Sequence, residues 1–312
     1  PPPPPPPRFS SRRRQTRYSL QSRGLGDVYK RQDQGFLYAQ TIGGWDPQQL
    51  IGQAMTVWTD SGPLPAVISR KPIHLLSSKE RAKVVDLDEL WLDIGAQDKA
   101  EAESKVRIGD SVTLELKYRE LIGDLVSGPG MDNNSGMWTV MQALRLSKES
   151  DSPLNCHLHS VATVQEEIGL RGARTAASSV DPSIAIAVDV THATDCPKID
   201  KYQQGDIALG KGPVIFRGPN INSKVAIRLI ELCESHSIPY QLAAIGRATP
   251  NDANVLQISG DGVATGLVAI PNRYMHSAVE VISLADIQNV ASLLARFAES
   301  ISPDDDFTPS LD

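Results

Sequence analysis

The sequence of 312 residues contains no run of eighteen apolar residues, and it has no basic stretch followed by an apolar stretch and a cleavage site. Transmembrane helices and secretory signals need these patterns, so neither is predicted. The three cysteines, Cys156, Cys196 and Cys233, cannot all pair with one another and do not have the spacing of a metal site. Such sparse cysteine favours a reducing compartment. We therefore expect a cytoplasmic protein with no membrane partner.

Aromatic side chains are also scarce, at 5% of the residues. Glycosidases generally need aromatic platforms for the sugar, so this scarcity counts against a carbohydrate-cleaving enzyme. Residues 1–32 carry a net charge of +7, and because the whole chain carries −6, the remaining residues carry −13. A protein with this acidic balance is not expected to bind nucleic acid.

The first 32 residues differ in composition from the rest of the chain. They are basic and rich in proline, which is typical of disorder. The stretch DVYKRQ, Asp27–Gln32, is what a transposase end sequence used in preparing sequencing libraries would encode. We therefore expect residues 1–32 to be a non-native, adapter-derived segment, and authentic protein to begin near Asp33. A basic tail that binds nucleic acid or carries an organelle address is the alternative.

Residues 33–122 have the pattern of a β-rich domain. In Val112–Leu121, apolar and polar residues alternate as they do in a half-buried strand. The shorter runs GFLYAQTIGG, QAMTVWT and LPAVIS are strand-like and are separated by Gly, Pro and Asp. The pattern predicts a small β-barrel or sandwich.

From residue 123 to residue 303, apolar strands alternate with amphipathic helices, and residues 304–312 have the composition of a tail. Near-continuous apolar strands between helices predict an α/β fold in which helices cover both faces of the sheet. The expected strands are Leu158–Val164 and Ile184–Val190, and the expected helices are Ser135–Lys148, Lys224–Ser235 and Leu284–Ser300.

Two adjacent carboxylates, Glu166 and Glu167, follow the first of these expected strands. Unpaired charges are not tolerated inside a strand that is buried on both faces, so we place them at its C-terminal end, where α/β sheets bind ligands. Three more side chains occupy similar strand–loop junctions: Asp132, Asp189 and His276. Carboxylates and a histidine at one sheet edge predict a divalent cation, whose charge offsets their repulsion.

Each of these residues also has an ordinary structural explanation when it is considered alone. A single Asp after a strand is more often a helix cap or turn residue than a ligand, and Glu–Glu pairs are common on exposed helices. Their joint occurrence is what favours a site. The other histidines are interpreted as structural residues: His74, His157, His159 and His236.

Four stretches resemble the tetrahedral-aminopeptidase family of glutamyl, deblocking and leucyl-type metallopeptidases, some of which have been called endoglucanase M. They are GMDNNSGM, TVQEEIGLRGA, AIAVDVTHATDCP and GVATGLVAIPNRYMHSAVEVISLADI. The resemblance covers residues 35–303. It implies a zinc-exopeptidase-like (phosphorylase/hydrolase-like) α/β sheet and an inserted β-barrel or sandwich dimerisation domain at residues 33–122. The stretches GGWDPQQLIGQAMTV and KPIHLL resemble that inserted domain.

This resemblance implies a hydrolase: a metallo-aminopeptidase that removes N-terminal residues from short peptides through a metal-activated water, in a homo-oligomer built from dimers. The intact subunit would hold two divalent metal ions, Zn or Co. Asp132 would bridge the two ions, Glu167 and His276 would complete one site, and Asp189 would belong to the other. Glu166 would stay unligated and move protons.

The resemblance further implies a cis peptide bond after Asp132, and it places Asp252, in the stretch NDAN, on a loop that lines the substrate channel. One departure concerns the family's first metal ligand, a histidine in an H-x-D-E-[IV]-G motif before the position that matches Gly35. The motif is absent here, so we expect a fragment that lacks the N-terminal part of its catalytic domain and has one well-formed metal site. An inactive metal-binding assembly subunit and a glycosidase remain open alternatives.

Overall fold

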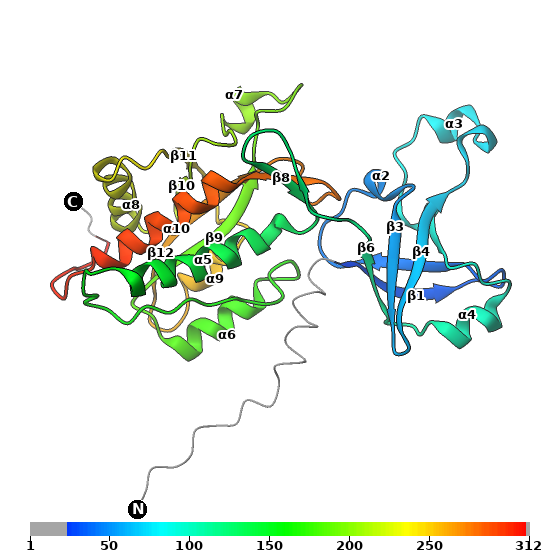
Figure 1. Cartoon of the computed structure of the whole chain (residues 1–312), viewed down its shortest axis with the longest axis horizontal. Coiled ribbons are helices and arrows are strands. Elements are labelled where there is room, and N and C mark those ends of the chain that lie inside the picture. Colours follow the sequence, from blue (N-terminus) through cyan, green and yellow to red (C-terminus); the bar gives the residue numbers. More distant parts are fainter. Residues whose placement is uncertain (1–23, 310–312) are drawn as a thin grey trace, which may run out of the picture. The chain divides into compact units, whose positions relative to one another are not determined.

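Six strands close into a barrel in the order β1-β2-β5-β4-β3-β6. They belong to the first of two units in the computed structural model, which describes residues 24–309 and divides between Glu115 and Leu116 (Figure 1). The strands are β1 (Gly24–Arg31), β2 (Leu37–Thr41), β3 (Ala54–Thr59), β4 (Gly62–Arg70), β5 (Leu90–Asp93) and β6 (Ser111–Leu114). Short helices connect them: α2 (Pro47–Leu50), η1 (Ile73–Leu75), α3 (Ser78–Arg81), η2 (Leu87–Glu89) and α4 (Lys99–Lys105). The structure therefore has the barrel rather than the sandwich.

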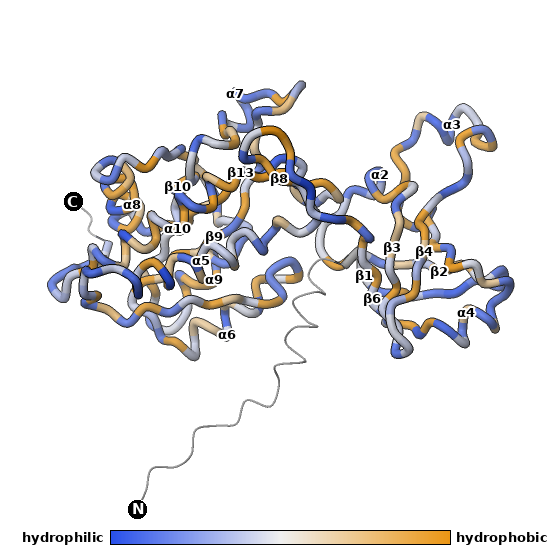
Figure 2. The backbone as a smooth tube through the Cα atoms, in the orientation of Figure 1, coloured by the Kyte–Doolittle hydropathy of each residue, from blue (hydrophilic) through white to orange (hydrophobic). Residues whose placement is uncertain are grey.

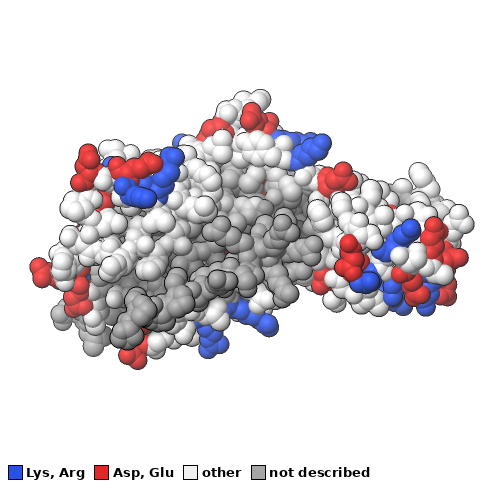
Figure 3. Space-filling view, turned by 60° about the horizontal axis from the view of Figure 1, so that its bottom comes forward, with Lys and Arg blue, Asp and Glu red and all other residues white. Residues whose placement is uncertain are grey.

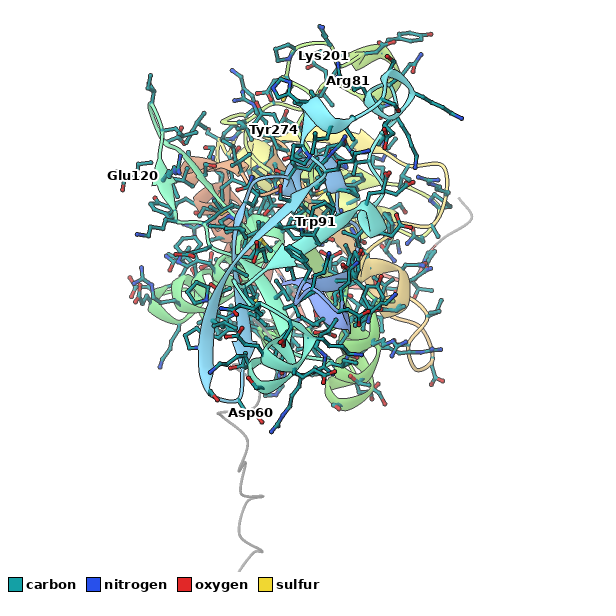
Figure 4. The ribbon with its side chains drawn as sticks, turned by 90° about the vertical axis from the view of Figure 1, so that its right-hand side faces the viewer. Asp60, Arg81, Trp91, Glu120, Lys201 and Tyr274 are labelled. Atoms are coloured by element: carbon teal, nitrogen blue, oxygen red, sulfur yellow. The ribbon has the colours of Figure 1, made fainter. Side chains whose placement is uncertain are left out.

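Buried and more exposed residues alternate along β2, β3 and β6, and Figure 2 colours these strands by hydropathy. In β3, the side chains of Met55 and Val57 are fully buried, whereas the neighbouring Trp58 is 47% exposed. The Trp58 indole Nε1 donates a hydrogen bond to Thr113 Oγ1 at 2.9 Å on the neighbouring strand β6. Asp60 lies at the tip of the β3–β4 hairpin (Figure 4). The apolar interior thus holds the barrel together.

Acidic and basic side chains are interspersed on the face of the barrel shown in Figure 3. Two of the pairs are Lys71–Glu80, with 3.0 Å between Nζ and Oε1, and Lys83–Asp86, with 2.7 Å between Nζ and Oδ2. All four side chains are more than 40% exposed, and each exposed pair of this kind contributes about 0–1 kcal/mol. Apolar burial therefore dominates the stability of the barrel.

Part of the segment expected to be disordered is ordered, because Gly24–Arg31 forms strand β1. This strand pairs antiparallel with both β2 and β6, and its Val28 is fully buried. Composition misses the strand because only alternate side chains of a barrel strand need to be apolar. The other residues of the expected segment, 1–23, lie outside the described residues, and an adapter origin for residues 1–32 stays a prediction.

Replacement of Val28 tests whether β1 belongs to the folded barrel. We expect Val28→Thr to lower the free energy of unfolding by about 1–3 kcal/mol, because it buries a hydroxyl where a methyl group packed. Lys30→Thr is the matched control, since Lys30 is an exposed residue of the same strand and should change stability by less than about 0.5 kcal/mol. Urea titration measures both variants. Equal stability of the Val28→Thr variant and the parent would exclude β1 from the barrel core.

The second unit contains a four-stranded sheet, in the order β11-β10-β12-β9, and a three-stranded sheet, in the order β13-β8-β7. In the larger sheet, β12 pairs parallel with β9 and antiparallel with β10, which pairs parallel with β11. The strands are β7 (Arg119–Glu120), β8 (Leu125–Gly128), β9 (Ile184–His192), β10 (Val214–Arg217), β11 (Gln241–Ala244), β12 (Ala264–Asn272) and β13 (Glu280–Ser283). The helices are α5 (Met131–Glu149), α6 (Arg171–Val180), α7 (Lys201–Gln204), α8 (Ser223–Ser235), α9 (Ala253–Leu256) and α10 (Leu284–Glu299).

Both faces of strand β12 are buried, as its near-continuous apolar sequence predicts. Val268 and Ile270 pack in one core cluster with residues of α8 and α10, and α5 lies beside α10 (Figure 1). Leu267, on the opposite face, packs with Ala253 of α9. The α/β architecture is therefore confirmed, and the three long helices expected from the sequence are present as α5, α8 and α10.

One segment of the second unit differs from the sequence predictions. The unit itself begins at Leu116, ahead of the pairing of β7 with β8, and the domain boundary expected at residue 123 stays a prediction. The run Leu158–Val164 was predicted to be a buried strand, but it has no strand partner among residues 24–309. Val161 and Val164 are 42% and 44% exposed. Apolar composition indicated burial, but a strand also needs a neighbour with which to exchange backbone hydrogen bonds.

The expected tail from residue 304 onward is docked on the second unit as far as Phe307. Phe307 is 9% exposed and belongs to the core cluster of α8 and α10. Arg228 of α8 lies with its guanidinium carbon 5.6 Å from the centre of the Phe307 ring. Its Nη2 also donates to Asp305 Oδ1 at 2.9 Å. One aromatic residue in an acidic stretch gives too weak a sequence signal to predict this docking.

Candidate metal centre

Three side chains from distant parts of the sequence converge in the second unit: Asp132, Glu167 and His276. One ligand atom from each can be chosen so that all three atoms lie within 4.8 Å of one another. His276 Nε2 is 3.1 Å from Asp132 Oδ2 and 3.9 Å from Glu167 Oε1. No other group of three His, Cys, Asp or Glu residues between residues 24 and 309 meets this criterion. The structure thus brings together three of the four metal ligands expected from the sequence.

Asp132 is held in place through its neighbour Asn133, which the sequence analysis did not single out. The bond between the two residues is cis, as predicted. Asn133 Nδ2 donates to the Val188 carbonyl of β9 at 2.8 Å, and Asn133 Oδ1 accepts from Gly136 N at 2.9 Å. A Cβ atom on Gly136 would clash with the Asn133 side-chain amide, so a larger residue there would displace that amide. These contacts connect the first turn of α5 to strand β9.

Glu166 and Glu167 lie in a tight turn immediately before helix α6, rather than at the end of a strand. The Glu166 carbonyl accepts hydrogen bonds from the backbone N–H groups of Gly169 and Leu170, at 3.0 and 2.9 Å. Gly172 N donates to the Val164 carbonyl at 2.8 Å and closes the turn. The turn directs the Glu167 carboxylate toward Asp132 and His276. Both carboxylates are half-buried.

His276 lies in the loop between β12 and β13, two residues after Tyr274, which is 49% exposed (Figure 4). Its φ of 62° is in the left-handed region, which residues other than glycine rarely adopt. The carboxylate of Glu280, which is 2% exposed, accepts from His276 N at 3.2 Å and from Asp132 N at 3.3 Å. Sequence reasoning missed Glu280, because a Glu near the start of a strand has no distinguishing pattern.

Burial and the repulsion of neighbouring carboxylates raise the pKa of the two glutamates in the cluster. Burial raises the pKa of Glu166 to about 8, and the charges of Glu167, Asp252 and Asp132 add to this rise. Burial, followed by the charge of Asp132, also raises the pKa of Glu167. The hydrogen bond to Asp132 raises the pKa of His276 to about 9. The positive charge of His276 opposes the rise in the pKa of both glutamates but does not cancel it.

Asp189 is not one of the three converging residues, although it belongs to the same electrostatic neighbourhood. It lies within β9, which continues to His192, and pairs in the β-ladder with Ala269. Burial and the negative charges of Asp132 and Glu166 raise its pKa well above the ordinary value. His192, a residue that sequence reasoning did not select, has its pKa lowered by burial and by the charge of His276. Both side chains therefore border the cluster.

Asp252, which the sequence placed on a loop near the substrate, precedes helix α9 at the same site. Its Oδ2 accepts a hydrogen bond from Thr163 Oγ1 at 2.7 Å. Its Oδ1 is buried and has no hydrogen-bond partner among residues 24–309. The charge of Asp252 adds to the rise in the pKa of Glu166 and of Asp189, so Asp252 belongs to the same electrostatic neighbourhood. Burial raises the pKa of Asp252 itself.

The chemistry of the three converging residues fits a divalent metal ion. Two carboxylates and one imidazole are ordinary zinc ligands, with bonds of about 2.0–2.2 Å, so two ligands of one ion lie about 3–4 Å apart. The distances of 3.1 and 3.9 Å from His276 Nε2 match that spacing. Without a cation, burial would penalise each carboxylate, as the raised pKa of Glu167 shows.

These pKa shifts predict how the stability of the metal-free protein depends on pH. The pKa of Glu166 rises from 4.5 to about 8, and that of His276 from 6.5 to about 9, so the folded state binds protons more tightly at both groups. Their stabilisation is complete below the ordinary pKa values and is lost as pH rises through the folded values. In chelator, we expect the urea midpoint to fall from about pH 5 to about pH 9.

The Glu166→Gln variant is the control for this pH dependence, since it removes one of the titrating groups. Its urea midpoint should fall less steeply between about pH 5 and about pH 8. A divalent cation should stabilise the parent more at high pH, where the carboxylates are charged. A parent midpoint that is flat or rises across this range in chelator would contradict the arrangement of charges described above.

Comparison with known proteins agrees with this geometry. Residues 28–293 match the model of the M42 glutamyl aminopeptidase family. The chain belongs to this family. The lysyl aminopeptidase of Pyrococcus furiosus is 37% identical over 279 residues, which cover 88% of this chain and 78% of that protein. The M42 chain described here is therefore a hydrolase of the peptidase class, as the sequence motifs predicted.

Solved structures of aminopeptidases share the fold. A TET aminopeptidase from a marine sediment archaeon of the Thaumarchaeota has a TM-score of 0.84 at 31% identity, covering 89% of this chain and 78% of that one. The TET1 peptidase of Pyrococcus horikoshii, which can assemble into a tetrahedron or a large octahedral shell, has a TM-score of 0.73 at 29% identity, covering 88% and 80%. None of the helices described between residues 24 and 309 combines the length and the apolar character needed to span a bilayer.

Proposed function

We propose that this M42 peptidase removes N-terminal residues from short peptides by metal-assisted hydrolysis. The observation that carries the proposal is the convergence of Asp132, Glu167 and His276 within 4.8 Å, beside the half-buried carboxylate of Glu166. The three residues form the metal site, and Glu166 stays free of the metal. The relatives named aminopeptidases support the reaction class.

The two adjacent glutamates have different roles, which we call their division of labour: Glu167 holds the metal and Glu166 moves protons. A divalent ion at the site would polarise the scissile carbonyl and make a water more acidic. Glu166 takes a proton from the attacking water and passes it to the nitrogen of the leaving amine. In the metal-free chain a pKa of about 8 keeps Glu166 largely protonated at neutral pH, and the charge of a bound cation would lower this pKa so that the carboxylate can accept the proton. Glu167, Asp132 and His276 hold the site in place and exchange no proton.

We propose zinc or cobalt as the native metal, with a second ion on the Asp189 side of Asp132. Carboxylate oxygens and one imidazole suit either ion. The buried carboxylate of Asp189, whose pKa is raised by Asp132 and Glu166, supports a second cation there. The family's first histidine ligand has no counterpart in this sequence, so the second ion should bind more weakly than the first.

Chelation tests the proposed reaction. Hydrolysis of an aminoacyl anilide should be lost on dialysis against a chelator and restored by Zn²⁺ or Co²⁺. A chain that binds the metal but hydrolyses no anilide would instead be the inactive assembly subunit. Hydrolysis of a glycoside, unaffected by chelator, would indicate the glycosidase. An anilide activity that survives complete removal of metal would contradict the proposal.

We also propose that the intact protein is a homo-oligomer built from dimers, and that the barrel unit supplies much of the contact. Three large apolar side chains of that unit, Ile73, Leu75 and Val84, are 63%, 66% and 70% exposed. Ile73 and Leu75 lie on the same short helix η1, and exposed apolar side chains that are close together are typical of protein–protein contacts. The shells formed by the P. horikoshii TET1 peptidase support the same interpretation. Light scattering of the full-length gene product should show an oligomer, and a stable monomer would overturn the proposal.

The chain is, in our proposal, a fragment of a longer metallopeptidase. The absent H-x-D-E-[IV]-G motif supports this, and so does the exposed apolar run Leu158–Val164, which has no strand partner among residues 24–309. Sequencing of the locus from genomic DNA should reveal the motif upstream of the codon for Gly35, in place of the codons for residues 1–32. An intact genomic frame that encodes residues 1–32 would contradict the adapter origin.

A further inference from the structure

One buried carboxylate is bonded to the backbones of two of the three converging residues. Glu280, at the start of β13, accepts from Asp132 N through Oε2 at 3.3 Å and from His276 N through Oε1 at 3.2 Å. Asn272 Nδ2 also donates to Oε1, at 3.3 Å. Asp132 and Glu280 are 148 positions apart in the sequence. A single side chain therefore joins the loop that carries His276 to the first turn of α5.

The two residues bonded to Glu280 both have unusual backbone conformations. His276 is in the left-handed region, with φ of 62°, which costs about 1–3 kcal/mol for a residue with a side chain. Asp132 has φ of −79° and ψ of 106°, so it is not helical although it lies within the bounds of α5. The N–H groups of both residues are partly buried, and Glu280 provides the acceptor for each.

We propose that Glu280 is a positioning residue of the metal centre, which fixes the backbones of Asp132 and His276 so that their side chains face one point. The inference rests on the proposed function, because it assigns Glu280 a role toward the metal. Glu280 touches neither the substrate nor the metal in this role. Its contribution is geometric: when its two bonds to backbone N–H groups are broken, the spacing of 3.1 Å between His276 Nε2 and Asp132 Oδ2 is no longer enforced.

Asp286 provides a matched control, since Glu280 could simply be a buried carboxylate that stabilises the fold. Asp286, in α10, is fully buried and also accepts from two backbone N–H groups, those of Gly210 and Gly212, at 2.8 and 2.7 Å. These glycines belong to a loop that contributes none of the three converging residues. Loss of a purely structural carboxylate should therefore have the same consequences at both positions.

The experiment measures the affinity of the purified full chain for Zn²⁺ and Co²⁺ by competition with a chromophoric chelator, in the parent and in Glu280→Gln and Asp286→Asn. A glutamine has one acceptor oxygen, so its NH₂ group would face either Asp132 N or His276 N. We expect Glu280→Gln to lower the affinity about 10–100-fold. The visible absorption bands of bound Co²⁺ should also change, since they report the ligand geometry. Asp286→Asn should retain the affinity and the Co²⁺ spectrum of the parent.

A second variant guards against a Glu280→Gln protein that fails to fold. Glu280→Asp keeps the charge but shortens the side chain by one methylene. The shorter carboxylate should keep a hydrogen bond to one of the two N–H groups and lose the other. This variant should show a smaller loss of affinity and a Co²⁺ spectrum between those of the parent and Glu280→Gln. Parent-like affinity and spectra in both Glu280 variants would overturn the role, as would an equal loss in Asp286→Asn. A parent that binds neither ion would overturn the metal centre itself, and with it the role of Glu280.

Discussion

Replacement of Glu166 by glutamine is expected to lower the hydrolysis of an aminoacyl anilide by about 10²–10⁴-fold, which is the usual contribution of a general acid–base residue. Glutamine fills the same space but cannot take a proton from water. Because Glu166 is not one of the three converging residues, the bound metal should remain. The rate should therefore fall while the metal content stays that of the parent.

Metal analysis and single-turnover kinetics together measure this separation. The effect should appear in kcat rather than in KM, since Glu166 acts during bond breaking. Glu149→Gln serves as a control for the chemical change, because Glu149 is a side chain 60% exposed at the end of α5. A Glu166→Gln enzyme that keeps a near-normal rate would show that another group moves the proton.

The sequence was sufficient to predict that Asp132, Glu167 and His276 lie together, and their role as metal ligands stays a prediction. None of these residues is distinctive alone, but their joint occurrence at strand–loop junctions, within stretches that resemble one family, singled them out without a structure. The long helices α8 and α10 were predictable because each repeats an apolar face over more than two turns.

The features that sequence reasoning missed depend on distant contacts. Glu280 is an ordinary polar residue until Asp132, 148 positions away, is folded against it. Leu158–Val164 has the composition of a buried strand, but among residues 24–309 no neighbour pairs with it. Strand β1 lies inside a segment whose average composition is basic and proline-rich, although its buried Val28 lines the barrel. In each case, the deciding interaction joins residues that no local window contains.

The adjacent residue Glu167 should behave differently from Glu166, although the chemical change is the same. We expect Glu167→Gln to lose both metal and hydrolysis, because a neutral amide is a poor substitute for a carboxylate ligand. Loss of a partner that only supports a ligand typically costs 10–100-fold in metal affinity, so loss of the ligand itself should cost more than about 100-fold. Added Zn²⁺ should consequently raise the melting temperature of Glu166→Gln but not that of Glu167→Gln.

The stability of the metal-free Glu167→Gln protein distinguishes ligand loss from misfolding. Burial and the charge of Asp132 raise the pKa of Glu167, so this carboxylate destabilises the metal-free fold once it is ionised. The neutral glutamine removes that repulsion, and the variant in chelator at about pH 8 should therefore be at least as stable as the parent. A variant that is stable without metal, and that gains nothing when metal is added, would have lost a ligand and kept its fold. If Glu167→Gln instead retains the full metal content of the parent, Glu167 is not a ligand, and the proposed division of labour between the two glutamates is wrong.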